Sequence, residues 1–393
     1  MLPPTLNHSM INIMVLDACN EIGSDSKSHQ QLDHIYDSVL RNEPPTRRAE
    51  TGKLYDQLKT PDELRIFEKV LVVGLGQLGL PVAKYLTERG FETYGYDIND
   101  TAMERAEKVA SVRKVTNLSE IDVFIICVST HRPEDMFSPQ VDGLLSIVEE
   151  ISREAKNGAL VSIESTIPRG TSKKVFEMLN HRLHVVHVPH RWYALEEKEH
   201  GVNQIRVIGG VCDCCLKNAI QFYGYSSDAI ENVIMNSKEG NSNSIILRSS
   251  MTESSSNDRA RNSSLKSTKN LGIPLHPVSN IEIAEISKIA ENAHRYLQIA
   301  FAEDLYLYSQ ANGINFAELR EALNTKWNVN ILEPRDGIGG HCLPKDTKMF
   351  LQSSHSPNKS KILSAAIEVD RAYRRYRHAK NTASKQRRGS RIL

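Results

Sequence analysis

A glycine-rich segment between a strand and a helix constrains this chain more than any other feature. The apolar run Val70–Val73 leads directly into the letters GLGQLG (residues 74–79), and the amphipathic stretch Leu78–Arg89 follows. In a dinucleotide-binding unit, the first glycine permits a tight turn, the second lets a pyrophosphate approach the backbone, and the third lets helix and strand pack closely. The helix start supplies unpaired N–H groups. The predicted cofactor-binding residues of this loop are Gly74, Gly76, Gln77, Leu78 and Gly79.

An acidic residue at the end of the next strand indicates which dinucleotide binds. The predicted strand Glu92–Tyr96 is followed by Asp97. A carboxylate at this position accepts the adenosine ribose hydroxyls and repels a 2′-phosphate, so NAD is preferred over NADP. A glycine-rich turn of purely structural role is the alternative. The preceding strand, the following helix and the acid together favour dinucleotide binding.

The segments around this loop alternate between strand and helix patterns. This alternation predicts an α/β fold with a Rossmann-like, doubly wound parallel sheet, followed by an all-helical middle domain. The expected strands are Val70–Val73, Glu92–Tyr96, Val123–Cys127 and Leu160–Ile163, and the expected helices are Leu78–Arg89, Ala102–Val109, Gly143–Ala155 and Ser172–Leu179.

Changes in composition divide the chain into four parts. Residues 1–66 form a polar extension with weak helical patterning at 31–40 and 53–67, and residues 67–278 form the NAD-binding Rossmann domain. Within this domain, the Ser- and Asn-rich stretch 236–270 is expected to be a disordered insertion. Residues 279–370 form a helical domain with a long helix, Ile281–Ala311, and a shorter one, Phe316–Leu323; residues 371–393 form a basic tail.

Composition excludes several other classes of protein. The net charge of +1 gives no global attraction to polyanions, and the apolar runs are too short to cross a bilayer. We therefore expect no membrane association and no secretion signal. Nucleic-acid binding through the basic tail is a distant alternative to a solvated terminus. Six cysteines in 393 residues do not make a disulfide scaffold, so we expect a reducing cytoplasm.

The stretch DGIGGHCLPKD (residues 336–346) combines glycines with a thiol and a carboxylate. Cys342 and Asp346 are four residues apart, so a helical turn places them on one face. A thiol near a helix start can have a lowered pKa and act as a nucleophile, whereas the simpler alternative is an ordinary buried cysteine. Lys288 and Asn292 also lie one turn apart on the long helix. With an NAD site, these residues fit the oxidation of an alcohol, capture of the aldehyde by a thiolate, and a second oxidation.

Five motifs in a fixed order extend this hypothesis. They are GLGQLGLPVA, ESTIPRGT, RVIGG, EIAEISKIAENAHRYLQIAFAEDL and GIGGHCLPKD, spread from about Glu68 to Asp346. In these motifs the chain resembles the UDP-glucose/GDP-mannose dehydrogenase family. The resemblance implies an NAD-dependent oxidation of the 6-hydroxymethyl group of a nucleotide sugar to a carboxylate, for polysaccharide precursors. It also implies a homodimer formed through the long helix.

The resemblance assigns roles to individual residues. It implies that Cys342 is the nucleophile that forms a thiohemiacetal and then a thioester. Lys288 and Asn292 stabilise the oxyanion. Asp346 orients or activates water and holds Lys288, and Glu164 is the expected base for thioester hydrolysis.

Four further residues are assigned to cofactor and substrate. Thr130 and Thr166 belong to the cofactor side, where Thr166 lines the nicotinamide. Gly339 and Gly340 let the sugar nucleotide approach the backbone beside the thiol.

The chain also departs from the family pattern. Residues 128–132 read VSTHR where the family usually has V-x-T-P-T, and residues 188–191 read VPHR where many members have S-P-E-R, so a sugar-contacting carboxylate is missing. Only 47 residues follow Asp346, fewer than the family's third domain needs, so we expect a truncated member. A catalytically silent NAD-binding or regulatory homologue is therefore the alternative. Among substrates, UDP-N-acetylmannosamine is slightly favoured and UDP-glucose stays open.

Two clusters outside these motifs are not assigned a function. The letters CDCC (residues 212–215) lack a second thiol pair at zinc spacing, so no metal site is predicted. His181, His184, His187 and His190 recur at every third residue, which matches neither one strand face nor one helix face. We expect these histidines to make scattered contacts near a strand.

Overall fold

The computed structural model describes residues 65–131, 135, 138–191, 201–224, 269–340, 342–354 and 360–389. All of them belong to one of the chain's two compact units, which spans Gln57–Leu393. The helical patterns expected at 31–40 and 53–67 lie outside the described residues, apart from the last few positions of the second. The same holds for the expected insertion at 236–270, apart from Lys269 and Asn270.

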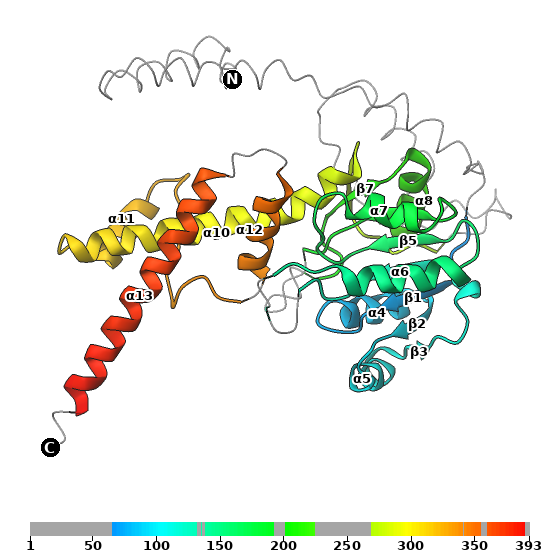
Figure 1. The fold of residues 1–393 in the computed structure, drawn as a ribbon, viewed down its shortest axis with the longest axis horizontal. Coiled ribbons are helices and arrows are strands. Elements are labelled where there is room, and N and C mark those ends of the chain that lie inside the picture. Colours follow the sequence, from blue (N-terminus) through cyan, green and yellow to red (C-terminus); the bar gives the residue numbers. More distant parts are fainter. Residues whose placement is uncertain are drawn as a thin grey trace, which may run out of the picture. The chain divides into compact units, whose positions relative to one another are not determined.

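A single sheet forms the first half of this unit (Figure 1). Its order is β3-β2-β1-β4-β5-β6-β7-β8, and every neighbouring pair is parallel except β6 and β7. The strand order reverses between β1 and β4, which is where doubly wound sheets bind their ligands. The strands are β1 (Lys69–Val73), β2 (Glu92–Tyr96), β3 (Arg113–Lys114), β4 (Val123–Ile126), β5 (Leu160–Ile163), β6 (His184–His187), β7 (Arg206–Gly210) and β8 (Leu275–Val278).

The expected fold class is confirmed, and the predicted strands and helices of residues 70–179 are found within one or two residues of their expected bounds. Strands β1, β4 and β5 are short apolar runs buried along nearly their whole length, as expected for strands covered on both faces. Helices cover the sheet: α4 (Gly79–Glu88), α5 (Asp100–Ala110), α6 (Asp142–Glu154), α7 (Thr171–Met178) and α8 (Asp213–Tyr223), with a 3₁₀ turn, η1 (Leu118–Glu120).

The far edge of the sheet was not predicted from the sequence. Strand β7 runs antiparallel to β6, and β8 then pairs parallel to β7. The lack of a side chain at Gly209 in β7 permits close packing on the first residue of the long helix, because a Cβ on Gly209 would meet the backbone of Ile281 at 2.7 Å. The strand is therefore pressed against the helix that leaves the sheet.

The second half of the unit is helical. It contains α10 (Ile281–Ala311), α11 (Phe316–Asn324), α12 (Cys342–Ser353) and α13 (Lys361–Gly389). The long helix α10 has the bounds predicted from its sequence, and Asn280 caps it by accepting the N–H of Glu282. Figure 1 shows α12 and α13 lying against α10. Their shared core includes Tyr296, Ala300, Ile338 and Ala366.

Most of the predicted basic tail is part of helix α13. Helix α13 runs through residues 371–389, which were expected to be a solvated terminus. Three of its basic side chains reach residues outside α13: Arg374 donates to the carbonyl of Ile338, Arg377 pairs with Asp336, and Lys380 donates to the hydroxyl of Tyr306. These contacts help to hold α13 against its neighbours. The sequence did not predict the helix beyond residue 370, because apolar residues are sparse there.

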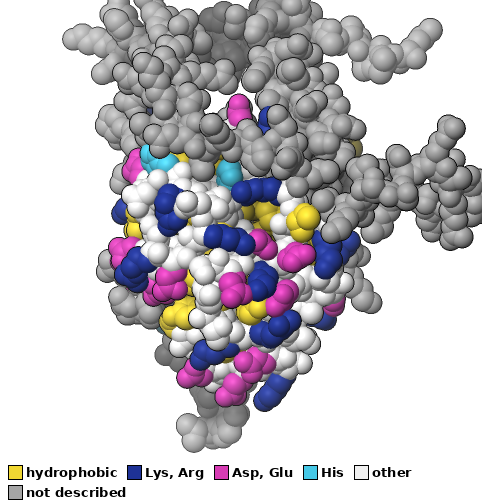
Figure 2. All heavy atoms as spheres, turned by 90° about the vertical axis from the view of Figure 1, so that its right-hand side faces the viewer, with side chains coloured by type: hydrophobic (Ala, Val, Ile, Leu, Met, Phe, Trp, Pro, Cys, Tyr) yellow, Lys and Arg dark blue, Asp and Glu magenta, His cyan; other side chains and the backbone are white. Residues whose placement is uncertain are grey.

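Charge on the sheet half is mixed. On the described residues of the face in Figure 2, basic and acidic side chains are interleaved. Within the described part of the chain, no helix combines the length and the apolar character needed to cross a bilayer.

One buried acid lies in the helical half. Glu303 on α10 is fully buried, and within the described residues its two carboxylate oxygens have no hydrogen-bond partner. Burial raises the pKa of Glu303 to about 8, and the charge of Asp370 adds to this shift. Folded Glu303 therefore keeps its carboxyl proton over a pH range in which the same residue is ionised in the unfolded chain.

Stability should fall as the pH rises through this range. Between the ordinary value of 4.5 and about 8, the unfolded state ionises while folded Glu303 stays protonated, so the free energy of unfolding decreases. Glu303→Gln should remove this decrease and gain on the order of 2 kcal/mol over the wild type at the upper end of the range. Urea unfolding at both ends of the range tests this, with exposed Glu318→Gln as the control. An equal pH dependence in wild type and Glu303→Gln would contradict it.

Candidate active site

The glycine loop has the geometry that the sequence predicts. Gly74 has a φ of 86°, and a Cβ there would meet the carbonyl oxygen of Cys127 at 2.8 Å. A Cβ on Gly79 would lie 1.7 Å from the carbonyl oxygen of Gly74, so helix α4 starts directly against the loop. A Cβ on Gly76 would meet no atom within 4 Å. The backbone at Gly76 therefore faces open space, where a pyrophosphate can approach.

Asp97 already supports this loop. Its carboxylate accepts the backbone N–H of Leu75 at 2.6 Å and that of Asn99 at 2.8 Å. Asn99 in turn caps helix α5. The carboxylate therefore sits at the end of β2 with a defined orientation, and its remaining lone pairs can accept the hydroxyls of a ribose.

We predict that the protein binds NAD more tightly than NADP and that Asp97→Ser reduces this preference at least ~10-fold, because the charged acceptor is lost. Both cofactors should bind less tightly, since Leu75 and Asn99 also lose their acceptor. The ratio of the two dissociation constants, measured by calorimetry, is therefore the readout. Asp100→Asn, at the exposed first turn of α5, is the control. Equal affinities in the unaltered protein would count against Asp97 as the selector.

Four of the predicted catalytic residues come from two packed helices. Lys288 and Asn292 lie on α10, and Cys342 and Asp346 lie on α12. The Asn292 amide donates a hydrogen bond to Oδ2 of Asp346. Asp346 is almost fully buried, so this hydrogen bond fixes a carboxylate that has left water.

Lys345 joins this group to the sheet, although the sequence reasoning did not select it. Its Nζ lies 3.1 Å from Oδ1 of Asp346 and donates to the hydroxyl of Thr130 at 3.1 Å. Thr130 follows β4, and its hydroxyl donates to the carbonyl of Thr166 after β5. The α12 turn therefore meets the carboxyl edge of the sheet, where Gly74 and Asp97 also lie. The sequence did offer a clue to Lys345, because this residue directly precedes Asp346 in the motif GIGGHCLPKD.

The charges of the same group of residues act on Lys288. Burial lowers the pKa of Lys288, while the charges of Asp346, Glu291 and Cys342 act in the opposite direction. We expected Asp346 to hold Lys288 through a direct contact. Instead, Asp346 forms an ion pair with Lys345, and it acts on Lys288 through its charge.

The expected low pKa of the Cys342 thiol is not found. Cys342 is the first residue of α12 and is exposed. Partial desolvation and the nearby Asp346 carboxylate raise the pKa of Cys342, and they outweigh the opposing charges of Lys345 and Lys288. The prediction placed Asp346 beside the thiol but did not count the rise that this carboxylate causes in the pKa of Cys342.

The backbone before the thiol is open. A Cβ on Gly339 or Gly340 would meet no atom within 4 Å, and Gly340 has a φ of 72°. This geometry is compatible with the close approach of a ligand that the sequence predicts for these glycines.

Glu164 lies in a different environment from the one expected for a base. It follows β5 and is almost fully buried, with Oε2 2.9 Å from Arg206 and also paired with His190, while the hydroxyl of Tyr223 donates to Oε1. Burial opposes its ionisation, yet Arg206, His190 and the Tyr223 hydroxyl together lower the pKa of Glu164 to about 2. A carboxylate this acidic and this fully engaged is a poor proton acceptor.

The same network explains one departure from the family pattern. His190 stands where many members have a carboxylate, and it is buried against Glu164 and Arg206. The other histidines of the series are dispersed: His187 is buried in β6, while His181 stacks on Phe176. They do not form one cluster.

Comparison with known proteins identifies the family. The family model for the NAD-binding domain of the UDP-glucose/GDP-mannose dehydrogenase family matches residues 102–227, and the model for its central domain matches residues 282–372. Together the two matches cover more than half of the chain. The chain therefore belongs to the UDP-glucose/GDP-mannose dehydrogenase family.

Characterised relatives carry related names. A UDP-N-acetyl-D-mannosamine dehydrogenase of Methanococcus maripaludis strain C7 is 27% identical over 325 residues, covering 77% of this chain and 65% of that relative. The enzyme of the same name from Campylobacter jejuni is also 27% identical, covering 77% of this chain and 72% of the relative. This chain thus spans about two thirds of the length of these relatives.

A solved structure shares the fold. The UDP-D-ManNAc dehydrogenase of Pyrococcus horikoshii superposes with a TM-score of 0.60 at 23% identity, over 82% of this chain and 72% of that one. The cofactor is NAD, as named for the matched domain. The residues present fit it: the backbone at Gly76 leaves room for a pyrophosphate, and the oriented Asp97 carboxylate has lone pairs that can accept ribose hydroxyls.

Proposed function

We propose that this protein oxidises the 6-hydroxymethyl group of a nucleotide sugar to the carboxylate, with NAD as the oxidant. The observation that carries the proposal is the junction of α10 and α12 with the carboxyl edge of the sheet. There, Lys345 bridges Asp346 to Thr130, and Asn292 holds the same aspartate. A thiol, an amine and an ordered carboxylate thus lie beside the loops that bind the dinucleotide.

NAD supplies the chemistry that accepts a hydride in each of two oxidations. The first oxidation converts the primary alcohol to an aldehyde and releases one proton. The sulfur of Cys342 then adds to the aldehyde carbon, its proton passes to the carbonyl oxygen, and a thiohemiacetal forms. The second oxidation removes a hydride from that carbon and releases the proton of its hydroxyl group, which gives a thioester.

Hydrolysis completes the reaction. Water adds to the thioester carbon, the carbon–sulfur bond breaks, one proton of the water restores the Cys342 thiol, and the other is released with the carboxylate product. Asp346 is placed to orient this water, because it lies one helical turn from the thiol and is held by Asn292 and Lys345. We assign Glu164 a positioning role in place of the base predicted from the family, since its oxygens are bound within the buried network.

Positive charge stabilises the oxygen in these steps. Negative charge develops on the former carbonyl oxygen while the sulfur adds, before the proton reaches this oxygen, and again in the hydrolysis intermediate. Lys288 and the Asn292 amide are the donors proposed to face it. Lys345 keeps the position of α12 relative to Thr130, so we propose it as a positioning residue for the thiol.

The names of the relatives favour an N-acetylated UDP-hexosamine, UDP-N-acetylmannosamine, as the substrate. UDP-glucose is the second candidate. We further propose a homodimer that forms through α10, because Ile283, Phe301 and Tyr308 expose large apolar side chains along this helix. The free thiols of the described cysteines support a reducing cytoplasm as the working compartment.

The test is to measure NADH formation by the purified chain with UDP-N-acetylmannosamine, UDP-glucose and GDP-mannose, and to measure NAD affinity on the same preparation. Two NADH per sugar and a uronic acid product are expected. NAD binding without turnover of any sugar would overturn the proposal in favour of the catalytically silent alternative. Two NADH distinguish the complete oxidation from one that stops at the aldehyde.

A further inference from the structure

Three thiols converge at the start of α8, away from the candidate active site. Cys212 is the amino-terminal cap of this helix, and its Sγ accepts the backbone N–H of Cys215 at 3.4 Å. The Sγ of Cys212 lies 2.7 Å from that of Cys214 and 3.2 Å from that of Cys215. Both distances are shorter than ordinary non-bonded contacts of roughly 3.5–4 Å. The three sulfurs are therefore close enough to share one ligand.

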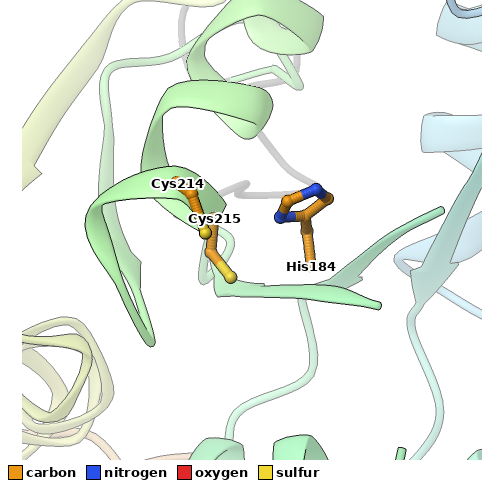
Figure 3. A group of neighbouring side chains, drawn as sticks. All are labelled: His184, Cys214 and Cys215. Atoms are coloured by element: carbon orange, nitrogen blue, oxygen red, sulfur yellow. The ribbon is translucent and has the colours of Figure 1, made fainter. Parts of the chain in front are cut away.

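Strand β6 supplies a fourth group, from a residue distant in sequence. His184 is 2% exposed, and within the described residues its Nδ1 has no hydrogen-bond partner. A ring nitrogen of His184 and the thiols of Cys214 and Cys215 all lie within 4.8 Å of one another. Figure 3 shows one ring nitrogen of His184 turned toward these two thiols. A buried, unpartnered nitrogen thus faces the thiol cluster.

We propose that Cys214, Cys215 and His184 bind one zinc ion, and that Cys212, whose Sγ lies beside both of these thiols, moves in as its fourth ligand. Three thiolates and one imidazole are a common ligand set of structural zinc sites. Zinc–sulfur bonds of about 2.3 Å in a tetrahedron place two ligand sulfurs about 3.8 Å apart. A bound ion would therefore hold the sulfurs of Cys214 and Cys215 about 1.1 and 0.6 Å further from that of Cys212 than they are here. It also gives Nδ1 of His184 the partner that it lacks.

The groups around the cluster act as a second shell. The Sγ of Cys215 accepts the backbone N–H of Val185 at 3.3 Å, which stabilises a buried thiolate. The Asn218 side chain lies 3.2 Å from Nε2 of His184 and accepts a hydrogen bond from Arg65. With zinc on Nδ1, the ring proton moves to Nε2, and Asn218 turns its amide so that the oxygen faces this proton. This turn gives up the bond from Arg65 and the bond that the Asn218 amide donates to the carbonyl of Cys214, and it gains one from His184.

A pair of redox-active thiols is the competing use of the cluster. Cys212 and Cys215 are three residues apart at a helix start, as in dithiol oxidoreductases. That chemistry needs two thiols only. It leaves Cys214 and the buried nitrogen of His184 without a role, so the observations favour the metal.

The position of the site indicates a structural role. His184 is the first residue of β6 and pairs in register with Leu160, the first residue of β5. The site therefore lies at the amino edge of the parallel strands, whereas the dinucleotide loop follows the carboxyl end of β1. The zinc ion ties α8 to β6, and it should affect stability without changing NAD affinity.

The experiment uses the full chain, stripped with a chelator under reducing conditions and titrated with Zn²⁺ against a chromophoric chelator. We expect one zinc per chain and a higher melting temperature with zinc. Co²⁺ in its place should give the sulfur-to-cobalt charge-transfer and tetrahedral d–d bands. Cys214→Ser should weaken zinc binding at least ~10-fold, as even the loss of second-shell partners weakens metal binding by this much. Cys342→Ser, which removes a thiol elsewhere, should bind zinc normally.

Several results would overturn the proposal. They are a wild-type chain that binds no zinc, equal affinities in wild type and Cys214→Ser, or loss of zinc in Cys342→Ser. A disulfide between Cys212 and Cys215 in the untreated protein, with no zinc uptake after reduction, would assign the cluster to redox chemistry. The titration of the unaltered chain decides the matter even if a variant fails to fold. It is independent of sugar turnover, so it can fail or succeed without the proposed function.

Discussion

Cys342→Ala is expected to abolish formation of the uronic acid, with a loss in turnover of at least ~10⁴-fold, because no other group in the proposed site can form the thioester. NAD affinity should not change, since the glycine loop and Asp97 lie on the sheet. The product analysis must separate acid from aldehyde. Cys342→Ser should retain the adduct as a slowly hydrolysed ester, because an alkoxide leaves less readily than a thiolate.

The pH dependence gives this prediction a second readout. Because partial burial and Asp346 raise the pKa of Cys342, the free protein holds its thiol mostly protonated, and turnover should rise with pH as the thiolate forms. Gln352→Ala, an exposed position on the same helix, is the matched control and should behave as the wild type. Acid formation by Cys342→Ala at a near-normal rate would exclude the covalent route.

Replacing Lys288 with methionine should lower turnover by ~10²–10³-fold, the usual cost of removing one donor that stabilises an oxyanion. The methionine keeps most of the apolar stem, so a loss caused by the missing charge can be told from one caused by packing. Burial lowers the pKa of Lys288, so the ammonium loses its charge at a lower pH than a free lysine does. Turnover should therefore decline on the alkaline side.

Lys288→Arg separates charge from proton transfer. A guanidinium stays charged at every pH of the assay, so this variant should keep part of the activity and lose the alkaline decline. Arg295→Ala, an exposed position two turns further along α10, serves as the control. If Lys288→Met retained full turnover, or if the alkaline decline persisted in Lys288→Arg, the role given to Lys288 would be wrong.

Local rules account for much of what the sequence predicted correctly. The strand–glycine–helix segment, the alternation of the first half and the bounds of α10 depend on residues within one or two turns of each other. The close packing of Gly79 on Gly74 is also local, because it follows from the missing side chains. The far edge of the sheet could not be predicted in this way, since the antiparallel pairing of β6 with β7 depends on how distant strands meet.

The same distinction between local and distant residues applies to the candidate site. The sequence by itself predicted which residues carry chemistry: the glycine loop, Asp97, Lys288, Asn292, Cys342 and Asp346. Only the tertiary structure decided the state and the partners of these groups. Lys345 bridges Asp346 to Thr130, Glu164 is held by Arg206, and His184 meets the cysteines of α8. A residue's type is written in the sequence, but the pKa and the contacts of a buried group depend on neighbours that folding brings from elsewhere in the chain.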